Sequence, residues 1–572
     1  MPRGCRTPIL PGMLSALLLA GCSMSRKALL APASQPQQQV PVHIAGTVGE
    51  YARLSGGGEM PVHGYGLVVG LGTNGSREVP APLREYFTQY LLKRKIIPSH
   101  SESGQISPQT VLSDLDTAVV EVRGLIPAGS APGRRFDVFV AALPQTQTRS
   151  LDGGILLPTE LYFTVQGPTV SKRSRAWAEA EGPVFVNPFL DPNVPEDLAK
   201  FRQGRLIGGG EVKEGRTYRL QLRQADYQIC NLIRSRINER FGRGEEIAKA
   251  SNPAAVDLKV PAAYGQDQES FLRLVMHLPL SQGGALEAKA VDIASAAGSP
   301  GANHEELALV WEAIGRQVLP TARKHYSSAN HLAAFYAART GARLGDPTAA
   351  EVLARFARMD GSPLQLQAIE ELGRCERSSV VLAALQPLVD DDNELVRIGA
   401  YEALLRQGDS ARIRRISIKD QFNLDLVAST RNYVVFATQT GEPKLVLFGK
   451  DMQILRPVFF SAPEDLVTIH ANQPRDQLTV IRKIPRTGKC SEPFSVDADV
   501  RSLVTTLGTL PAQRSDQRRA GLGLTYGQVV SVLYRMCKEG DIRAEFRLQQ
   551  LPDVQRIYRD TVTVGRPDTP GS

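Results

Sequence analysis

The sequence predicts a multidomain α+β protein in which a mixed body of strands and helices is interrupted by an α-solenoid. Three observations support this class. Short apolar runs bounded by glycine and proline fill residues 44–280, as strands joined by turns do. Helical spacing of alanine and leucine takes over in residues 304–420. Strand patterns then return in residues 421–552.

The N-terminus predicts export and a lipid anchor. Arg3 and Arg6 precede a short apolar run, residues 13–20, which is typical of a secretory signal and too short to span a bilayer. The signal, residues 1–21, ends before Cys22 in Leu-Ala-Gly-Cys, which resembles the lipobox of bacterial lipoproteins. We expect the Cys22 thiol to carry a diacylglyceryl group, since several acyl chains anchor stably. The alternative is an ordinary cleaved signal followed by a coincidental cysteine.

Residues 22–43 are predicted to form the lipidated end and a flexible tether. They are rich in proline, glutamine and alanine and show no periodicity. Ser23 follows the lipobox where aspartate would favour retention in the inner membrane, by analogy with known sorting rules. This favours anchoring to the outer membrane.

A glycine-rich run opens the first body. Residues 63–75 read HGYGLVVGLGTNG, with the apolar residues lying between the glycines. This pattern predicts a short buried strand with glycine-permitted bends at both ends. A nucleotide-binding loop is the alternative, but it requires glycines that follow a strand and open a helix.

The next elements follow in order along the first body. The apolar spacing predicts an amphipathic helix over residues 83–97. Strands are predicted over 117–122, 136–140 and, after a glycine turn, within 150–157.

These motifs resemble flagellar basal-body P-ring proteins. GYGLVVGLG, LIPAGSAPGRRFDVFV and SLDGGILL stand here in the order and spacing of that family. Residues 204–242 fit it as well, with Asp226-Tyr227 at the family's acidic-aromatic pair and Asn238–Gly242 at its Asn-x-x-Phe-Gly. Residues 256–261 and an apolar helix around 271–278 continue the pattern. The resemblance implies a P-ring-like body over residues 44–280.

After a linker at 281–303, residues 304–420 predict a helical array. Turn residues such as Gly345-Asp346-Pro347 recur at intervals of roughly thirty residues, as in helical repeats. The unit at 388–404 resembles a HEAT repeat, with Val396, Ala400 and Leu404 on one helix face. Such an array either offers a concave surface to a partner or serves as a stabilising spacer.

The C-terminal part resembles the end of the P-ring family, so the array is predicted to be an insertion. Strands are predicted at 433–437, 444–449 and 477–480, helices at 500–507 and 524–533, and a closing strand within 540–548. The Thr440-Gly441 turn and the Ala544-Glu545 pair stand at the family's positions. Residues 553–572, which are charged and contain proline and glycine, are predicted to be a disordered tail.

The chain has six cysteines and no CxxC pair. If Cys22 is lipidated, a disulfide between Cys490 and Cys537 is conceivable in an oxidising compartment. Buried free thiols are the alternative.

No catalytic, cofactor or metal residues are predicted. The sequence has no GxSxG, HExxH or P-loop motif, and His325 and His331 are not placed together on a helix face by their spacing. Paired acids such as Glu305-Glu306 and Asp390–Asp392 are expected at helix starts, where negative charge is favourable. The net charge of +8 comes without a dense basic run with interleaved aromatics, which argues against a nucleic-acid partner.

The resemblance implies a structural subunit of the periplasmic flagellar ring. It implies that copies of the chain form a closed ring around the flagellar rod, with the outer-membrane L-ring protein and peptidoglycan as further partners. Contact with the membrane is expected from the lipid anchor at Cys22, not from the resemblance. The rival hypothesis is a P-ring-derived envelope lipoprotein that scaffolds something other than a flagellum through its helical array. A peptidoglycan-binding protein that forms no ring is a third class, for which we find no motif.

Overall fold

The computed structural model describes residues 40–551 except 57, 95–106, 129, 164–174, 216, 266, 474–476, 485–487 and 512–520. Contacts divide the chain into two units, residues 1–41 and 42–572. The predicted signal peptide, Cys22 and tail 553–572 lie outside the described residues. Strands and helices both occur throughout the second unit, which confirms the α+β class.

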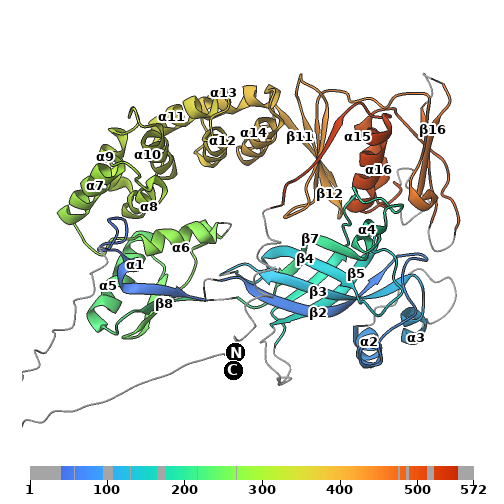
Figure 1. The fold of residues 1–572 in the computed structure, drawn as a ribbon, viewed down its shortest axis with the longest axis horizontal. Helices are drawn as coiled ribbons and strands as arrows, with labels where there is room; N and C mark the ends of the chain where they lie inside the picture. Colours follow the sequence, from blue (N-terminus) through green and yellow to red (C-terminus); the bar gives the residue numbers. More distant parts are fainter. Residues whose placement is uncertain are drawn as a thin grey trace, which may run out of the picture. The chain divides into compact units, whose positions relative to one another are not determined.

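A closed six-stranded barrel forms the centre of the first body (Figure 1). Its strands follow one another around the barrel in the order β2-β3-β4-β7-β6-β5. They are β2 (Met60–Val69), β3 (Thr117–Ile126), β4 (Arg135–Ala142), β5 (Ile155–Phe163), β6 (Ala178–Pro183) and β7 (Gln203–Val212). Alternating burial along β4 follows from the two-residue period of a strand with one face in the core. The sequence predicted most of these strands but not that they close into a barrel.

The glycine run corrects one expectation. Gly64 and Gly66 lie inside β2 and not at a bend, and a side chain on Gly66 would come within 2.5 Å of Thr159 Oγ1. The turn begins only at Gly70 and Gly72, whose φ angles of +86° and +63° favour glycine. The next helix starts only at Ala81, nine residues after Gly72, so these glycines do not open a helix.

Two helices cover part of the barrel through a small cluster that includes Leu67, Phe87, Leu91 and Val119. They are α2 (Ala81–Arg94) and α3 (Pro108–Leu112). The predicted helix 83–97 corresponds to α2, although its last three residues lie outside the described part. A one-turn helix, α4 (Pro195–Leu198), and the 3-10 turn Lys200–Arg202 precede β7.

A second, smaller layer pairs the four-stranded antiparallel sheet β1-β8-β10-β9 with helices. Its elements are α1 (Val48–Tyr51), β1 (Ala52–Ser55), β8 (Tyr218–Leu222), α5 (Tyr227–Phe241), β9 (Ala248–Asn252), β10 (Ala255–Leu258), the 3-10 turn Ala262–Tyr264 and α6 (Gln268–Met276). Asp226, the acidic member of the acidic-aromatic pair, caps α5 by accepting from the backbone N–H groups of Gln228 and Ile229. Its role here is to start a helix.

The predicted helical array is present and is longer at its start than expected. Its helices are α7 (Gly284–Ala297), α8 (His304–Ile314), α9 (Leu319–Arg323), α10 (His331–Arg343), α11 (Pro347–Ala357), α12 (Gln365–Arg374), α13 (Ser379–Leu385) and α14 (Glu394–Arg406), with 3-10 turns at Arg316–Val318 and Gln386–Asp390. Residues 281–303, predicted as a linker, contain α7, whose Leu286 and Ile293 share the core of the array. The predicted end at 420 is also wrong, because a strand, β11 (Ile413–Ile418), begins before it.

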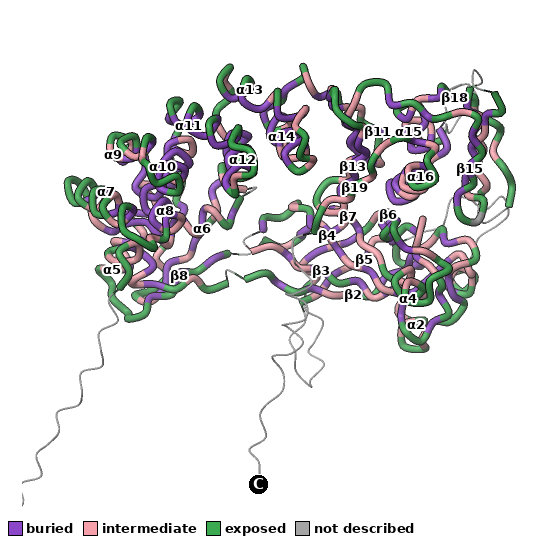
Figure 2. The backbone as a smooth tube through the Cα atoms, turned by 45° about the horizontal axis from the view of Figure 1, so that its top comes forward, coloured by how far each residue is buried: buried purple, intermediate pink, exposed green. Residues whose placement is uncertain are grey.

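Burial within the array follows the predicted helix face. Val396, Ala400 and Leu404 are at most 1% exposed, and buried positions line the packed sides of the helices (Figure 2). The acidic run Asp390–Asp392 does not start α14 as expected. Asn393 caps that helix, because its side chain accepts the Leu395 N–H at 3.0 Å.

The C-terminal part has two sheets with two helices between them (Figure 1). The mixed sheet β11-β12-β14-β13-β19 contains parallel pairs β12–β14 and β13–β19, and the second sheet is β15-β16-β17-β18. The elements are β11 (Ile413–Ile418), β12 (Phe422–Val427), β13 (Val434–Ala437), β14 (Lys444–Phe448), β15 (Val458–Ser461), the 3-10 turn Pro463–Asp465, β16 (Val467–Ala471), β17 (Leu478–Arg482), β18 (Phe494–Val496), α15 (Val500–Gly508), α16 (Tyr526–Glu539) and β19 (Glu545–Leu548). One apolar core joins both sheets and both helices.

Candidate functional site: the charged joints around the helical array

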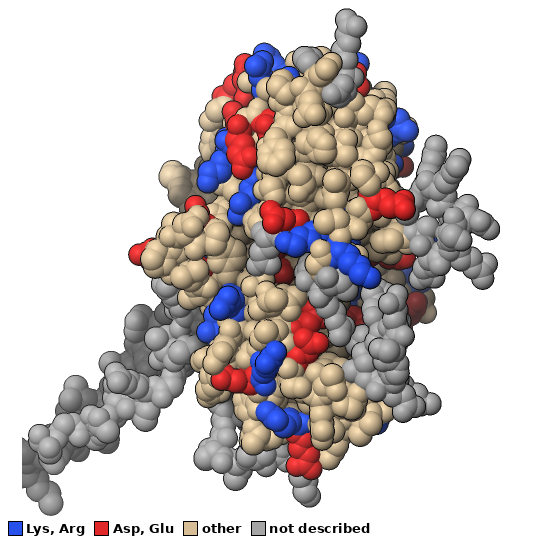
Figure 3. All heavy atoms as spheres, turned by 90° about the vertical axis from the view of Figure 1, so that its right-hand side faces the viewer, with Lys and Arg blue, Asp and Glu red and all other residues tan. Residues whose placement is uncertain are grey.

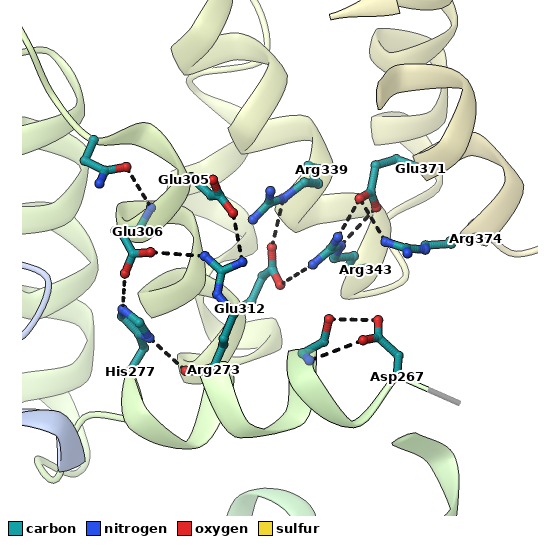
Figure 4. A network of polar contacts seen from close by, with 12 residues as sticks. Asp267, Arg273, His277, Glu305, Glu306, Glu312, Arg339, Arg343, Glu371 and Arg374 are labelled. Carbon is teal, nitrogen blue, oxygen red and sulfur yellow. Dashed lines mark hydrogen bonds and ion pairs between the residues drawn. The ribbon is translucent and has the colours of Figure 1, made fainter. Parts of the chain in front are cut away.

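The array meets the first body at a joint between α6 and α8. Asp267 caps α6 by accepting the Ser270 N–H, and Asn303 caps α8 by accepting the Glu306 N–H. These caps fix where each helix begins. Arg273 on α6 then reaches both acids of the first turn of α8, with Nη1 2.9 Å from Glu305 and Nη2 3.0 Å from Glu306 (Figure 4). The expectation that Glu305-Glu306 lies at a helix start is confirmed, and the pair also binds the neighbouring body.

His277, at the end of α6, completes this joint. Its Nε2 lies 2.6 Å from Glu306 Oε2 and its Nδ1 lies 2.7 Å from the Arg273 carbonyl oxygen. Burial raises the pKa of Glu306, but His277 and Arg273 lower it by more, so the pKa lies below its usual value. The His43 ring stacks on His277 with centroids 6.2 Å apart, and the Lys289 ammonium donates to the Val42 and Ala45 carbonyls. The chain that enters from the predicted tether is therefore held at this joint.

A series of ion pairs, called the ladder below, connects helices α8, α10 and α12 of the array. Glu312 on α8, only 3% exposed, pairs with Arg339 at 3.3 Å and Arg343 at 3.2 Å, both on α10 (Figure 4). Arg343 also pairs with Glu371 on α12, and Glu371 in turn with Arg374. Although burial lowers the pKa of Arg343, its two carboxylate partners raise it by more, which keeps its guanidinium charged.

The ladder is a structural brace by its chemistry. Each buried carboxylate in it has two guanidinium partners, so neither carboxylate is left free for a ligand. Removing one partner of a buried pair strands the other charge, which is far more costly than the net value of the pair. The ladder therefore specifies how neighbouring helices are placed against one another.

The other end of the array is joined to the mixed sheet. Glu394 in the first turn of α14 pairs with Arg547 on β19 at 2.7 Å. Asp390 accepts the backbone N–H of Thr430 at 2.6 Å and pairs with Arg412 at 3.2 Å. The acidic run at 390–392 thus tethers the array to the sheet, a role that the sequence did not suggest.

A buried polar group lies just behind this second joint. The Tyr401 hydroxyl on α14 donates to Asp425 Oδ2 at 2.6 Å, and Arg415 binds both oxygens of Asp425 at 2.8 Å. Burial and the Asp425 charge raise the pKa of Tyr401, so it stays a neutral donor. Asp425 is fully buried, and this bidentate pair accounts for its presence in the sheet.

A third joint links the barrel to the C-terminal part. The Asp137 carboxylate on β4 accepts the backbone N–H of Gly208 at 2.7 Å and of Gly441 at 3.1 Å, and it also accepts the Thr440 hydroxyl. The Phe185 ring stacks on Tyr526 of α16 with centroids 5.8 Å apart. Two motifs that the sequence analysis named separately, the FDVFV strand and the Thr440-Gly441 turn, therefore meet in space.

The predicted site residues have different outcomes. Cys22 lies outside the described residues, so its lipidation stays a prediction. Cys490 is an exposed free thiol and Cys537 a half-buried one, and the conceivable disulfide between them is not formed in the structure. Burial raises the pKa of the Cys537 thiol to about 12. Both thiols are free, but the alternative of buried free thiols does not describe Cys490, which is exposed.

Within residues 40–551, apart from the gaps named above, no group of three or more His, Cys, Asp or Glu side chains is placed to hold a metal ion. No helix among those residues is both long and apolar enough to cross a membrane. On the face drawn in Figure 3, acidic and basic side chains are interspersed and a large area carries neither.

The sequence missed all three joints, although some signals were present. Arg339 and Arg343 stand four residues apart, as do Glu370 and Arg374, so each pair projects from one helix face. Such spacing marks a charged stripe but does not say which neighbouring helix will face it. Asp137 gave no signal, because a single acid in a strand has many ordinary explanations.

Comparison with known proteins supports the resemblance. Residues 47–296 match the family model described as flagellar P-ring protein. The flagellar P-ring protein of Anaeromyxobacter sp. (strain K) is 32% identical over 235 residues, which is 39% of this chain and 58% of that protein. That of Thermotoga maritima is 30% identical over 237 residues, 40% of this chain and 64% of that protein.

The matches define how far the relationship extends. The flagellar P-ring protein of Nitrobacter winogradskyi is 27% identical to this chain over 234 residues, and the match covers 57% of that protein. The chain thus spans about three fifths of the length of the curated relatives it matches. The resemblance of the first body to flagellar P-ring proteins is confirmed, and the matched range 47–296 ends within α7, the first helix of the array.

Proposed function

We propose that this chain is a structural subunit of a flagellar P ring, assembling with copies of itself around the rod in the periplasm at the peptidoglycan layer. The observation that carries the proposal is the continuous match of the barrel and the second, smaller layer of sheet and helices to flagellar P-ring proteins. The outer-membrane L-ring protein and peptidoglycan are further proposed partners. Cys22 would hold each subunit at the outer membrane through its acyl chains.

The joints support a load-bearing and non-catalytic role. Subunits of a ring around a rotating rod must resist shear, and a subunit with stiff internal joints transmits such a load without deforming. The helical array is bonded to the first body by Arg273 and to the mixed sheet by Glu394. We propose that the array, whose sequence resembles HEAT repeats, braces the subunit between these two attachments.

The experiment is deletion of the gene, followed by scoring of swimming and electron microscopy of purified basal bodies. We expect non-motile cells whose basal bodies lack the ring, and full recovery when the wild-type gene is returned. A strain without the gene that swims normally and retains its ring would contradict the flagellar role.

A non-flagellar envelope scaffold is the second candidate, and it is favoured by the array. Apart from α7, the array lies beyond the residues that match the family, and it presents exposed leucines near the starts of three helices, at positions 332, 366 and 395. The same deletion distinguishes the candidates, because a scaffold of this kind predicts unchanged motility together with an envelope defect.

A further inference from the structure

A cavity of about 600 Å³ lies where the barrel meets the C-terminal part. The cavity is lined by separate stretches of the chain, namely residues 70–74, 149–152, 186–201 and 463–466, together with Lys483 and one face of α16. Two of these stretches are glycine motifs, GLGTNG and SLDGG, which the sequence analysis interpreted only as turns. None of the joints described above uses them.

The walls of the cavity are held by hydrogen bonds within the protein. The Gly72 N–H donates to Asp116 Oδ1 at 2.7 Å, and the Arg149 N–H donates to the Asn74 carbonyl oxygen at 2.7 Å. The Leu151 N–H donates to the Phe201 carbonyl oxygen at 2.9 Å. The two glycine motifs are thereby bonded to each other and to the segment before β7. A site with preformed walls loses less entropy when a ligand binds.

The barrel and α16 are closely fitted beside the cavity. A side chain on Gly153, whose φ is +72°, would lie 2.4 Å from the Gln528 side-chain nitrogen. Gln528, Ser531 and Arg535 are three and four positions apart, so they share the face of α16 that lines the cavity. The second glycine motif therefore lets α16 approach closely enough to contribute one wall.

Basic side chains outnumber acidic ones around the cavity. Arg149, Lys483 and Arg535 line it together with Asp152 and Asp465. Lys483 pairs with Asp465 at 3.5 Å. Arg149 lies in a loop and Arg535 on α16, and both line the cavity; Arg535 also helps, after the Asn193 backbone N–H, to lower the pKa of Asp191 in the 186–201 stretch. Two arginines from different elements therefore offer their donors to the same space.

We propose that this cavity binds a short acidic peptide through its carboxylate groups. A guanidinium presents paired N–H donors that match a carboxylate, and it stays charged at any physiological pH. Asn187, Gln528 and Ser531 supply uncharged donors and acceptors for peptide groups, and Leu71 and Phe201 supply apolar wall. The volume lies within the range of roughly 300–1,000 Å³ that small-ligand sites occupy.

A nucleotide fits the cavity less well than a peptide. Its phosphates would need glycine N–H groups at the start of a helix, and here the glycine turn after β2 precedes a loop. The proposal does not depend on ring assembly, because binding by the purified chain is measurable whether or not a ring forms.

The test is calorimetric titration of the purified full-length chain with the tripeptide Ala-Glu-Ala as the free acid. Ala-Gln-Ala with an amidated C-terminus is the uncharged control, and inorganic phosphate is a third probe. A peptide with D-glutamate in place of L-glutamate distinguishes a cell-wall source from a protein source. We expect one of the two acidic peptides to bind, with an affinity that falls as salt is raised.

Variants locate the site. Arg149→Gln and Arg535→Gln should each weaken binding about tenfold or more, since each removes a charge-assisted hydrogen bond. Arg414→Gln, which makes the same change at an exposed position of β11 outside the cavity, should leave the affinity unchanged. Circular dichroism spectra that match the wild type show that a variant is folded.

Four results would overturn the proposal. They are binding of the uncharged peptide as tight as the acidic one, binding of phosphate only, no binding at all, and equal affinity in folded Arg149→Gln and Arg535→Gln variants.

Discussion

At the scale of single residues, the buried carboxylates of the array are stabilised by ion pairs and not by contact with water. Glu312 and Glu371 are 3% and 6% exposed, and each faces two arginines. Inside a protein a carboxylate is tolerated only when such partners replace its hydration. The ladder is therefore a place where single substitutions have large effects.

Glu312→Ala should lower the free energy of unfolding of the array by about 3 kcal/mol, because it leaves Arg339 and Arg343 short of a buried partner. Urea unfolding followed by the fluorescence of Trp311, in a Trp177→Phe background, measures this transition because the chain has two tryptophans. Glu351→Ala, at an exposed position of α11, is the control and should cost less than about 0.5 kcal/mol. Equal losses in both variants would show that the ladder is not a brace.

Asp346 predicts a dependence of stability on acid pH. Burial raises the pKa of this carboxyl, but hydrogen bonds from Arg323, Tyr326 and Thr348 lower it to about 2. Because this folded-state pKa lies below the unfolded value, the stabilisation is complete above about pH 4 and is lost as the pH falls towards 2. Asp346→Asn should cost about 2 kcal/mol at pH 6, and its difference from the wild type should shrink below pH 4.

The measurement is the same Trp311 unfolding experiment repeated between pH 2 and pH 6. Asp360→Asn, at an exposed position, provides the comparison for a general effect of acid. A difference between wild type and Asp346→Asn that stays constant over this range would refute the assignment.

At the scale of elements, close helix packing in the array depends on small residues. A side chain on Gly373 of α12 would lie 2.8 Å from the Ala403 Cα of α14, whereas one on Gly399 would meet nothing closer than 3.6 Å. The two glycines lie in adjacent helices of the same core, so they form a matched pair.

Gly373→Ala should destabilise the array by about 1–3 kcal/mol, because the added methyl group forces α12 and α14 apart. Gly399→Ala should instead stabilise it by up to about 1 kcal/mol, since alanine favours a helix and has room here. Thermal unfolding monitored by circular dichroism compares the two variants. A stabilising Gly373→Ala would contradict the packing of these helices.

Most elements could be predicted from the sequence, because their periodicity is local. The helices α2, α15 and α16 and most barrel strands fall where apolar spacing placed them. Helix α7 was missed because its alanine-rich sequence has few large apolar residues to mark a face. The joints could not be predicted, since Asp137 and Thr440 are separated by 303 positions and no local pattern pairs them.

At the scale of the whole molecule, the residues that follow the predicted tether are bound where the first body meets the array. Lys289 and His277 hold residues 42–45 at that joint. A force applied through a lipid anchor would therefore reach both parts of the molecule at once. This gives the proposed anchor a mechanical role within the proposed ring.

Cys22→Ala should abolish metabolic labelling with a fatty acid and release the protein from the membrane fraction. The thiol is the only group of that residue that can accept the diacylglyceryl chain, and a protein without acyl chains loses its hydrophobic anchor. Cys490→Ala, which removes an exposed thiol elsewhere, should leave labelling unchanged. Labelling that persists in Cys22→Ala would mean that the lipobox resemblance is coincidental.

The sequence by itself determined the α+β class, the family resemblance of the first body and the presence of a helical insertion. Each of these follows from local periodicity or from motifs in a fixed order, which can be recognised without knowing the fold. Only the tertiary structure decided that six strands close into a barrel, that the array is bonded at both ends, and that two glycine motifs share a cavity with Arg149 and Arg535. These features depend on residues far apart in the chain, which only the packing of the folded core brings within reach of one another.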